Sequence, residues 1–454
     1  MNLKANRSGY LLVAFLLAMV TRAAQGGATL PVGVPRADSA IHLTLPQALE
    51  EAQAANRGLK ALGHRRKAAE HDASALARSR WGELGSAFSY SYLNDDQILR
   101  PMSRELIAGG IGSMPFDRSQ MHYGVNYRIP LYLGGRLNNQ IQIAKLESQK
   151  AEALLEGARW QVRFNVISLY TAAQTLDRVL AALDEQLAAL AQTKARLDVM
   201  VSEGKRPEVD RLKVIEELEG VKARRATTAA DRLKVGSFLL SLLGREPTDR
   251  LTVDPLPEQA PSLGVGPDEL RVALQRNSRI RQAELAAEQS ERGIKVARST
   301  FLPKVYAGAN YLEHTGAESD RSLETWMAGV TVELPLFAGT SRFQKLHAAR
   351  EKRAAAREAL ADTQLRLAAE LEDALAKFDA ARTNLVSARA RIAAAAEAAR
   401  IEQVRYETGA GTIEDLLRAQ AREEGARAAL AAAQGELLTA AARINSLVEQ
   451  EVVK

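Results

Sequence analysis

Residues 129–134 read Ile-Pro-Leu-Tyr-Leu-Gly, and residues 334–339 read Leu-Pro-Leu-Phe-Ala-Gly. The two stretches belong to a longer internal repeat, because residues 127–244 recur at 332–449, about 205 positions later, without losing register. Neither copy of a repeat of this length, with both strand-like and helix-like patterns, could easily bury its own apolar stripe without the other. We therefore expect the two copies to pack around a shared axis.

Each copy contains one long stretch that is predicted to be a single helix. From about 134 to 201 and again from about 339 to 408, proline is absent and glycine is scarce. At about 1.5 Å per residue, each stretch would be a rod on the order of 100 Å long. A heptad register filled by leucine in the first rod is filled by alanine in the second, so we expect leucines of one copy to fill alanine-lined holes on the other. The leucines are Leu169, Leu176, Leu183, Leu190 and Leu197, and the alanines are Ala374, Ala381, Ala388 and Ala395.

Shorter helices are expected at about 46–80 and 267–300, since Pro46 and Pro267 suit the first turn of a helix. Four further prolines mark a linker between the copies. The expected organisation is a first repeat over 29–245, a proline-rich linker over 246–266 and a second repeat over 267–450.

Four other segments alternate apolar and polar residues with the period of a β-strand. Segments of about 10 residues that are apolar on one face and polar or small on the other are typical of transmembrane strands, with lipid outside and water inside. A half-buried soluble sheet packed on a helix gives the same alternation, but four such segments favour the membrane. The segments lie at 88–92, 123–129, 305–311 and 326–334, and the candidates for the water-filled side are Asn126, Arg128, Thr331 and Glu333.

Four strands are too few to close a barrel, and lipid tolerates no open sheet edge. Since a barrel needs about eight strands at least, two chains would supply eight and three would supply twelve. The strand count leaves both options open but requires an oligomer. The connections at 94–120 and 314–324 are expected to be outward loops.

The first 28 residues are predicted to be a secretory signal peptide, because Lys4 and Arg7 precede a short apolar run from Tyr10 to Val20. The absence of cysteine excludes disulfides, thiolate metal ligands and a catalytic thiol, and it suits a Gram-negative envelope protein. The 61 basic and 55 acidic residues are nearly balanced and alternate along the helices, so nucleic-acid binding is not expected.

No arrangement of residues predicts catalysis, a cofactor or a metal centre. His64 and His71 lie two turns apart on one predicted helix, but no third ligand stands at helical spacing, so a solvated face is the simpler interpretation. The cluster of Gly109, Gly110 and Gly112 precedes no Lys-Ser or Lys-Thr pair and is not a phosphate-binding loop. We therefore expect a protein that is not an enzyme.

As a set, these motifs resemble the outer-membrane efflux protein family, the TolC-like proteins, over about residues 42–450. The resemblance rests on the two stretches quoted first, on Arg-Tyr-Glu-Thr-Gly at 405–409 and on Ala-Arg-Ser-Thr-Phe-Leu-Pro-Lys at 297–304. It implies a mainly α protein with a small β part, a homotrimer whose twelve-stranded outer-membrane β-barrel continues into a periplasmic α-barrel tunnel. It also implies a periplasmic adaptor and an inner-membrane pump as partners, for the export of drugs, metals or polypeptides.

The resemblance gives a role to the turns in which Gly204 and Gly409 interrupt the long helices. In the family such turns form the periplasmic tip, where the tunnel narrows and the adaptor docks. Tyr406, Asp210 and Asp415 match positions that hold the entrance closed or ring it with acid. The alternative for the two aspartates is helix capping or compensation of the helix dipole.

The chain departs from the family pattern at this entrance. Gly411 lies where family members can have an arginine that pairs with the first aspartate, and Arg418 replaces a possible second acid. The sequence therefore does not determine which interactions close the gate. The predicted function is a passive outer-membrane duct of a tripartite efflux or type I secretion system, with a large periplasmic extension and a gate at its tip. The alternative is a periplasmic or peripheral coiled-coil protein without a pore.

Overall fold

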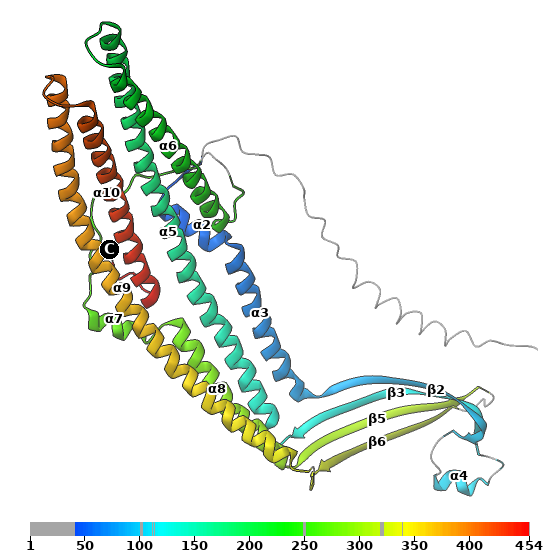
Figure 1. The fold of residues 1–454 in the computed structure, drawn as a ribbon. Coiled ribbons are helices and arrows are strands. Elements are labelled where there is room, and N and C mark those ends of the chain that lie inside the picture. The colour runs from blue at the N-terminus through cyan, green and yellow to red at the C-terminus, as the bar shows by residue number, and fades with distance from the viewer. Residues whose placement is uncertain are drawn as a thin grey trace, which may run out of the picture. The chain divides into compact units, whose positions relative to one another are not determined.

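Two helical hairpins that repeat at the spacing of the sequence repeat dominate the computed structural model (Figure 1). In each hairpin a helix of 67 residues leads to a turn, and a second helix returns beside it. The hairpins are α5 (Arg136–Ser202) with α6 (Glu208–Leu242), and α9 (Ser341–Glu407) with α10 (Ile413–Val448). The long helices thus begin and end within about two residues of the expected positions. None of the helices in the described ranges combines the length and the apolar character needed to cross a membrane.

The structure describes residues 41–99, 103–110, 112, 114–247, 251–317, 322–337 and 339–453. The predicted signal peptide, residues 1–28, lies outside these ranges. Residues from His42 onward form one unit. Its remaining helices are α2 (Leu45–Ala55), α3 (Arg57–Arg78), α4 (Arg104–Ala108), α7 (Pro267–Leu274) and α8 (Ser278–Arg298), with the 3-10 turns η2 (Ser79–Trp81) and η4 (Ser299–Phe301).

The single helices expected at 46–80 and 267–300 are each divided in two, so this expectation was wrong. Asn56 separates α2 from α3 and caps α3, because its side chain accepts a hydrogen bond from Leu59 N. Asn277 does the same between α7 and α8, accepting from Arg279 N. A side-chain oxygen that satisfies the amides of a new first turn stabilises a fresh helix start, which a continuous helix would not need.

The strands form a four-stranded antiparallel sheet in the order β2-β3-β5-β6. The strands are longer than the sequence pattern suggested, because the backbone pairing between neighbouring strands continues beyond each alternating segment. A separate two-stranded sheet joins β1 to β4. The bounds are β1 (Ile41–Leu43), β2 (Glu83–Ile98), β3 (Phe116–Tyr132), β4 (Leu251–Val253), β5 (Lys304–Gly316) and β6 (Ser322–Glu333).

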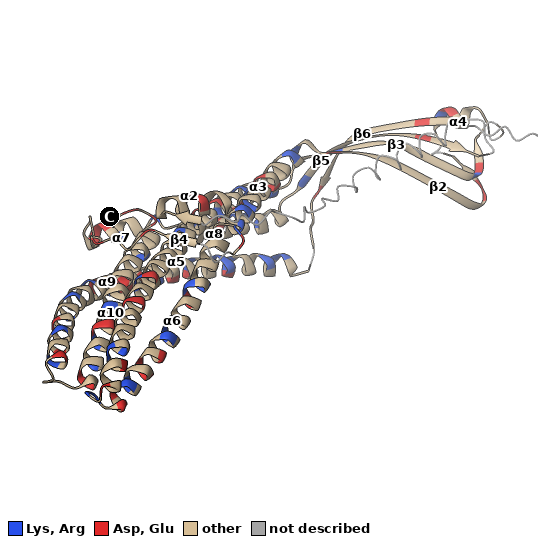
Figure 2. Cartoon of the chain, turned by 90° about the horizontal axis from the view of Figure 1, so that it is seen from above, with Lys and Arg blue, Asp and Glu red and all other residues tan. Residues whose placement is uncertain are grey.

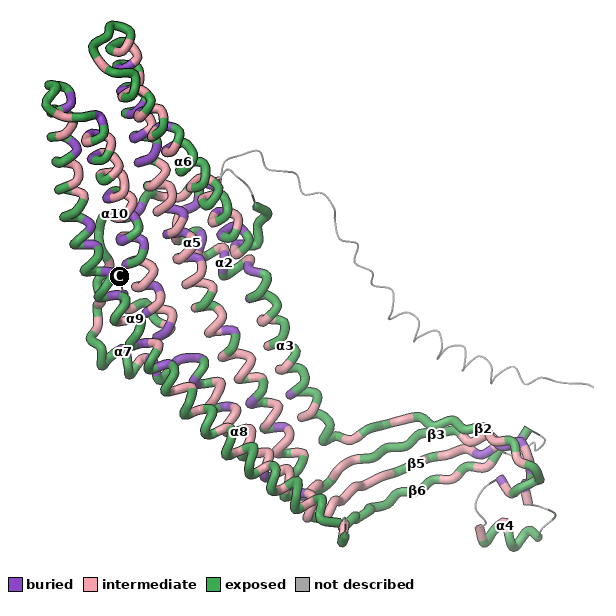
Figure 3. The backbone as a smooth tube through the Cα atoms, viewed as in Figure 1, coloured by how far each residue is buried: buried purple, intermediate pink, exposed green. Residues whose placement is uncertain are grey.

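The pairing register places all four apolar patterns on one face of the large sheet. Val125 lies opposite Tyr311, and Tyr311 lies opposite Trp326, whose exposed fraction is 78%. Figure 3 shows that the strands are exposed or intermediate for most of their length, while buried residues follow the helices. Figure 2 shows charged residues spread along the helices, whereas the middle of each strand carries few of them. An exposed apolar sheet face is expected of a lipid-facing surface.

The expected fit of leucine from one copy into alanine of the other is wrong. Leu183, Leu190 and Leu197 of α5 cluster with residues of α6, with Tyr406 at the end of α9 and with the first turn of α10. Ala374 and Ala381 of α9 instead cluster with α10 of their own hairpin. The two repeats meet through α5 and α10, and each heptad seam packs mainly against the second helix of its own hairpin.

Candidate functional site

Two turns of the same geometry end the long helices, as the repeat predicted. Gly204 has φ 72° and Gly409 has φ 77°, a left-handed conformation that favours glycine. The hydrogen bonds recur as well, since Lys205 N donates to the carbonyl of Met200 and Ala410 N donates to that of Arg405, each over 2.8 Å. The chain therefore reverses at the same point of both repeats.

Asp415 lies in the first turn of α10, where Thr412 is the N-cap. Its backbone N–H donates to Thr412 Oγ1 at 3.1 Å, and the Thr412 hydroxyl donates to Asp415 Oδ2 at 2.7 Å. The bond from Thr412 lowers the pKa of the Asp415 carboxyl below its usual value, as do the charges of nearby arginines. Arg418 lies 3.9 Å from Asp415 Oδ1. Thr412 is therefore the cap, and Asp415 lies where a carboxylate interacts favourably with the helix dipole, with an arginine beside it.

Asp210 lies in the first turn of α6 and is half-buried. Its backbone N–H donates to the carbonyl of Pro207. Carboxylates in a first turn interact favourably with the amide dipoles of a helix start. Both aspartates of the sequence prediction therefore sit at helix starts beside the glycine turns.

Tyr406 lies between the two hairpins and is only 9% exposed. The guanidinium of Arg206 stands 4.7 Å from the centre of its ring, and Arg206 also donates to the Tyr406 carbonyl at 3.2 Å. Burial raises the pKa of the Tyr406 hydroxyl, the charge of Arg206 opposes this shift, and the charge of Asp210 adds to it. Within the described ranges the buried hydroxyl has no hydrogen-bond partner. The ring of Tyr406, rather than its hydroxyl, makes the contacts at this position.

No pattern in the sequence pointed to Arg206. It follows Gly204 by two positions, but its partner Tyr406 lies 200 positions away in the other repeat. The sequence also did not predict two ion pairs between the helices next to these turns. They join Arg196 to Glu407 at 3.5 Å and Lys213 to Glu414 at 3.2 Å. They connect the two tips, although exposed pairs of this kind contribute little stability.

The four candidates for the water-filled side of the sheet share the face opposite the apolar one. Asn126 lies opposite Asn310, and Arg128 lies opposite Gly308. The guanidinium of Arg128 stands 4.0 Å from the ring centre of Tyr306 and 3.8 Å from Glu333. Thr331 lies on this face too, because it pairs with Tyr306.

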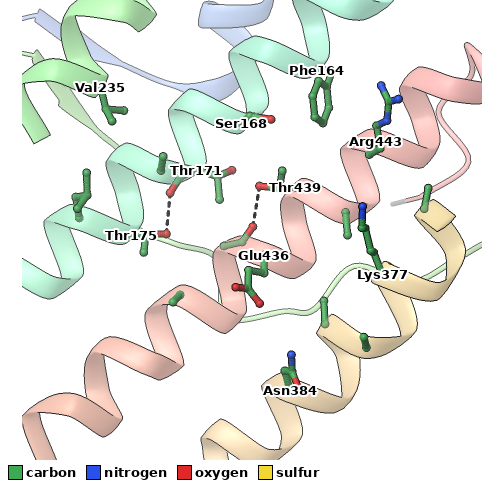
Figure 4. Close-up of a pocket in the computed structure, with 18 of the residues that line it drawn as sticks. Phe164, Ser168, Thr171, Thr175, Val235, Lys377, Asn384, Glu436, Thr439 and Arg443 are labelled. Carbon is green, nitrogen blue, oxygen red and sulfur yellow. Dashed lines mark hydrogen bonds between the residues drawn. The ribbon is translucent and has the colours of Figure 1, made fainter. Parts of the chain in front are cut away.

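A groove of about 1030 Å³ lies along the four long helices, with residues of all four in its lining (Figure 4). Small side chains such as Thr171 and Thr175 come from α5, and Lys377 and Glu436 come from α9 and α10. A Cβ on Gly435 would lie 2.6 Å from Thr175 Oγ1, so α10 approaches α5 closely along the groove. The lining carries both signs of charge and no cluster of groups that would select one ligand.

The family model described as outer membrane efflux protein matches residues 48–245 and 270–448. The chain belongs to the outer membrane efflux protein family. The two matched segments contain the two helical hairpins and the four strands of the large sheet. Members of this family are channels of the outer membrane and not enzymes, which favours the duct over the pore-free coiled-coil protein.

Solved structures of membrane proteins share the fold of this efflux family member. A membrane protein from Pseudomonas aeruginosa is 21% identical, with a TM-score of 0.75 over 89% of this chain and 90% of that chain. VceC from Vibrio cholerae is 18% identical, with a TM-score of 0.75 over 89% and 96% of the two chains. The CmeC outer membrane channel of Campylobacter jejuni is 18% identical, with a TM-score of 0.77 over 90% and 86%. Comparison of the sequence with curated proteins gives no match.

Proposed function

We propose that this protein is the outer-membrane duct of a tripartite efflux or type I secretion system, a passive path from periplasm to exterior that is gated at its periplasmic tip. The observation that carries the proposal is the large sheet. One of its faces is apolar and exposed, and its outer strands β2 and β6 each pair with a single neighbour in the described part of the chain. Since lipid tolerates no unpaired strand edge, β2 of one copy pairs with β6 of the next.

Family members are trimeric channels that work with adaptor and pump partners. Three copies of this sheet give twelve strands, enough to enclose a water-filled bore lined by Asn126, Arg128, Thr331 and Glu333. The groove on the long helices continues this bore as a hydrated wall. Its small side chains and mixed charge suit passage of cargo more than retention.

The gate of the duct lies at the two turns. Gly204 and Gly409 shape the tip, and Asp210 and Asp415 place carboxylates there, so that three copies ring the entrance with acid. Gly411 supplies no arginine to pair with an aspartate at this entrance. Arg206 of the first repeat instead contacts the ring and the carbonyl of Tyr406 in the second repeat, and so holds the two tips of one protomer together.

The tip also carries the docking surface for a periplasmic adaptor, through which an inner-membrane pump delivers cargo. Apolar side chains are exposed on the helices close to both turns, which supports contact with a partner. They include Val199, Val209, Leu212 and Val404, whose exposed fractions are 56%, 52%, 53% and 47%.

The absence of cysteine permits a direct test of the strand closure. Variants that carry one cysteine in β2 and one in β6 should form disulfide-linked trimers upon oxidation in detergent, at one register of a short scan along both strands. Each single-cysteine variant is the control and should give no trimer ladder. Reconstituted protein should show unit conductance in planar bilayers. A detergent-independent monomer without conductance would refute the proposed function.

A further inference from the structure

Two histidines face each other on the polar side of the large sheet. His122 on β3 and His314 on β5 are directly opposed partners in the strand pairing. Their Nδ1 atoms lie 2.8 Å apart, and the ring centres lie 4.8 Å apart with the planes at 67°. Two nitrogen atoms at this distance share either a proton or an ion.

The orientation of His314 is fixed from a third strand. Its Nε2 lies 2.8 Å from Thr325 Oγ1 on β6. When Nε2 carries the proton and donates it to this hydroxyl, Nδ1 presents its lone pair toward His122. A partner on the far ring nitrogen that sets the tautomer in this way is the usual arrangement behind a metal-binding histidine.

We infer that His122 and His314 form a binding site for a divalent copper or nickel ion. Neutral imidazole suits both metals, and both favour square-planar or tetragonal coordination. With metal–nitrogen bonds of about 2.0 Å, two ligands at adjacent corners of a square are separated by about 2.8 Å. The observed separation matches this spacing, whereas a tetrahedral zinc site would need the nitrogens about 0.5 Å further apart.

The site is open and exchanges its ion. His314 is 8% exposed, but His122 is half-exposed, so an ion reaches the pair from the side of His122. In the described part of the chain no group of three or more histidine, cysteine or acidic side chains is placed to hold a metal.

The pair shares its sheet face with Asn126 and Arg128. Its position inside the bore rests on the proposed function, under which a trimer would carry three such pairs. The ability of one chain to bind the ion does not depend on that proposal.

The test uses the full-length protein purified in detergent and titrated with copper(II) sulfate. Electron paramagnetic resonance should show a tetragonal copper signal with nitrogen hyperfine structure from two imidazoles, at one ion per chain. His122→Gln and His314→Gln should each weaken copper binding at least about tenfold, and Thr325→Val should weaken it about tenfold through the orientation of His314. His64→Gln, on the exposed face of α3, is the matched control and should bind copper as the unchanged protein does.

Circular dichroism and elution volume identify any variant that fails to fold, and Thr325→Val then carries the test because it keeps both imidazoles. Copper binding that is equal in the unchanged protein and in both histidine variants would overturn the site. Absence of a two-nitrogen signal would mean that the pair only shares a proton and would overturn it too. Copper binding by a protein that forms no conducting trimer would support the site while refuting the proposed duct.

Discussion

The side-chain amide of Asn277 donates a hydrogen bond to the carbonyl oxygen of Leu447 over 2.8 Å, which ties the break between α7 and α8 to the last turn of α10. Asn56 makes the equivalent bond to the carbonyl of Leu242, also over 2.8 Å, at the end of α6. Each asparagine thus caps the helix that it begins and satisfies a carbonyl at the end of a neighbouring hairpin. These two bonds anchor the second helix of each hairpin to its own repeat.

Asn277→Ala should destabilise the protein by about 1–3 kcal/mol, because it leaves the Leu447 carbonyl without a partner and removes a helix cap. Asn277 is 2% exposed and Asn56 is 8% exposed, so Asn56→Ala should cost less. Thermal unfolding followed by tryptophan fluorescence measures both. Asn384→Ala, at an exposed position of α9, is the control and should leave the midpoint unchanged or raise it slightly through helix propensity. Equal midpoints for Asn277→Ala and the control would contradict the anchoring role.

The long helices and the sheet faces were predictable because their signals are periodic and local. The repeat spacing between Gly204 and Gly409 predicted both turns correctly. The alternation around Val125 and Trp326 predicted that their apolar side chains lie on one face of the sheet. Periodicity averages over many residues, so single exceptions do not disturb it.

Contacts between segments far apart in sequence were not predictable in this way. The heptad pattern identified Leu190 and Ala381 as core positions but could not say which helix covers them, because any of several neighbouring helices could bury the same apolar stripe. The link from Arg206 to Tyr406 and the opposition of His122 to His314 depend on how the two repeats pack, and no local pattern encodes that.

Gly409→Ala should destabilise the protein by about 1–2 kcal/mol, because φ is 77° and an L-residue is strained there. Apart from the two adjoining residues, no atom in the described ranges lies within 4 Å of the position that the new Cβ would take, so the cost comes from the backbone. Gly425→Ala inside α10 is the matched control, with equally open space, and should stabilise by up to about 1 kcal/mol through helix propensity. Shifts of the same sign in the two variants would contradict this reading of the turn.

Arg206→Gln should open the periplasmic tip, because it removes the cation held over the ring of Tyr406 and the bond to its carbonyl. A cation–π contact of this kind contributes about 0.5–2 kcal/mol, enough to raise the frequency of open events several-fold. Single-channel recording in planar bilayers measures the change. Arg211→Gln is the control and should not alter gating, since the ion-pair partners of Arg211, Glu208 and Asp198, both belong to its own hairpin and not to the other repeat.

Tyr406→Phe distinguishes the contribution of the ring from that of the hydroxyl, because it removes only the hydroxyl. The ring and its contact with Arg206 remain, and the hydroxyl that is lost has no partner within the described ranges. We therefore expect unchanged gating and equal or slightly higher stability. If Tyr406→Phe opened the channel as strongly as Arg206→Gln, the hydroxyl would be the closing group.

Glu449 ends α10 in a left-handed conformation, with φ 53°, and its carboxylate accepts a hydrogen bond from Ser278 N at 3.0 Å. Burial raises the pKa of Glu449 above 4.5, and the bonds from Ser278 oppose the shift only in part. A carboxyl whose pKa is higher in the folded protein binds its proton more readily there than in the unfolded chain. Its charged form is therefore unfavourable to folding at neutral pH, and this cost disappears as the pH falls through the folded pKa toward 4.5.

Glu449→Gln should raise the unfolding midpoint at pH 7 and above, because the amide oxygen still accepts from Ser278 N and carries no charge. The gain over the unchanged protein should shrink steadily as the pH is lowered toward 4.5, where the carboxyl of the unchanged protein is neutral when folded. Glu358→Gln, at an exposed position of α9, is the control and should show no such trend. A gain from Glu449→Gln that stayed constant between pH 4.5 and 8 would show that the variant acts through packing and not through the buried charge.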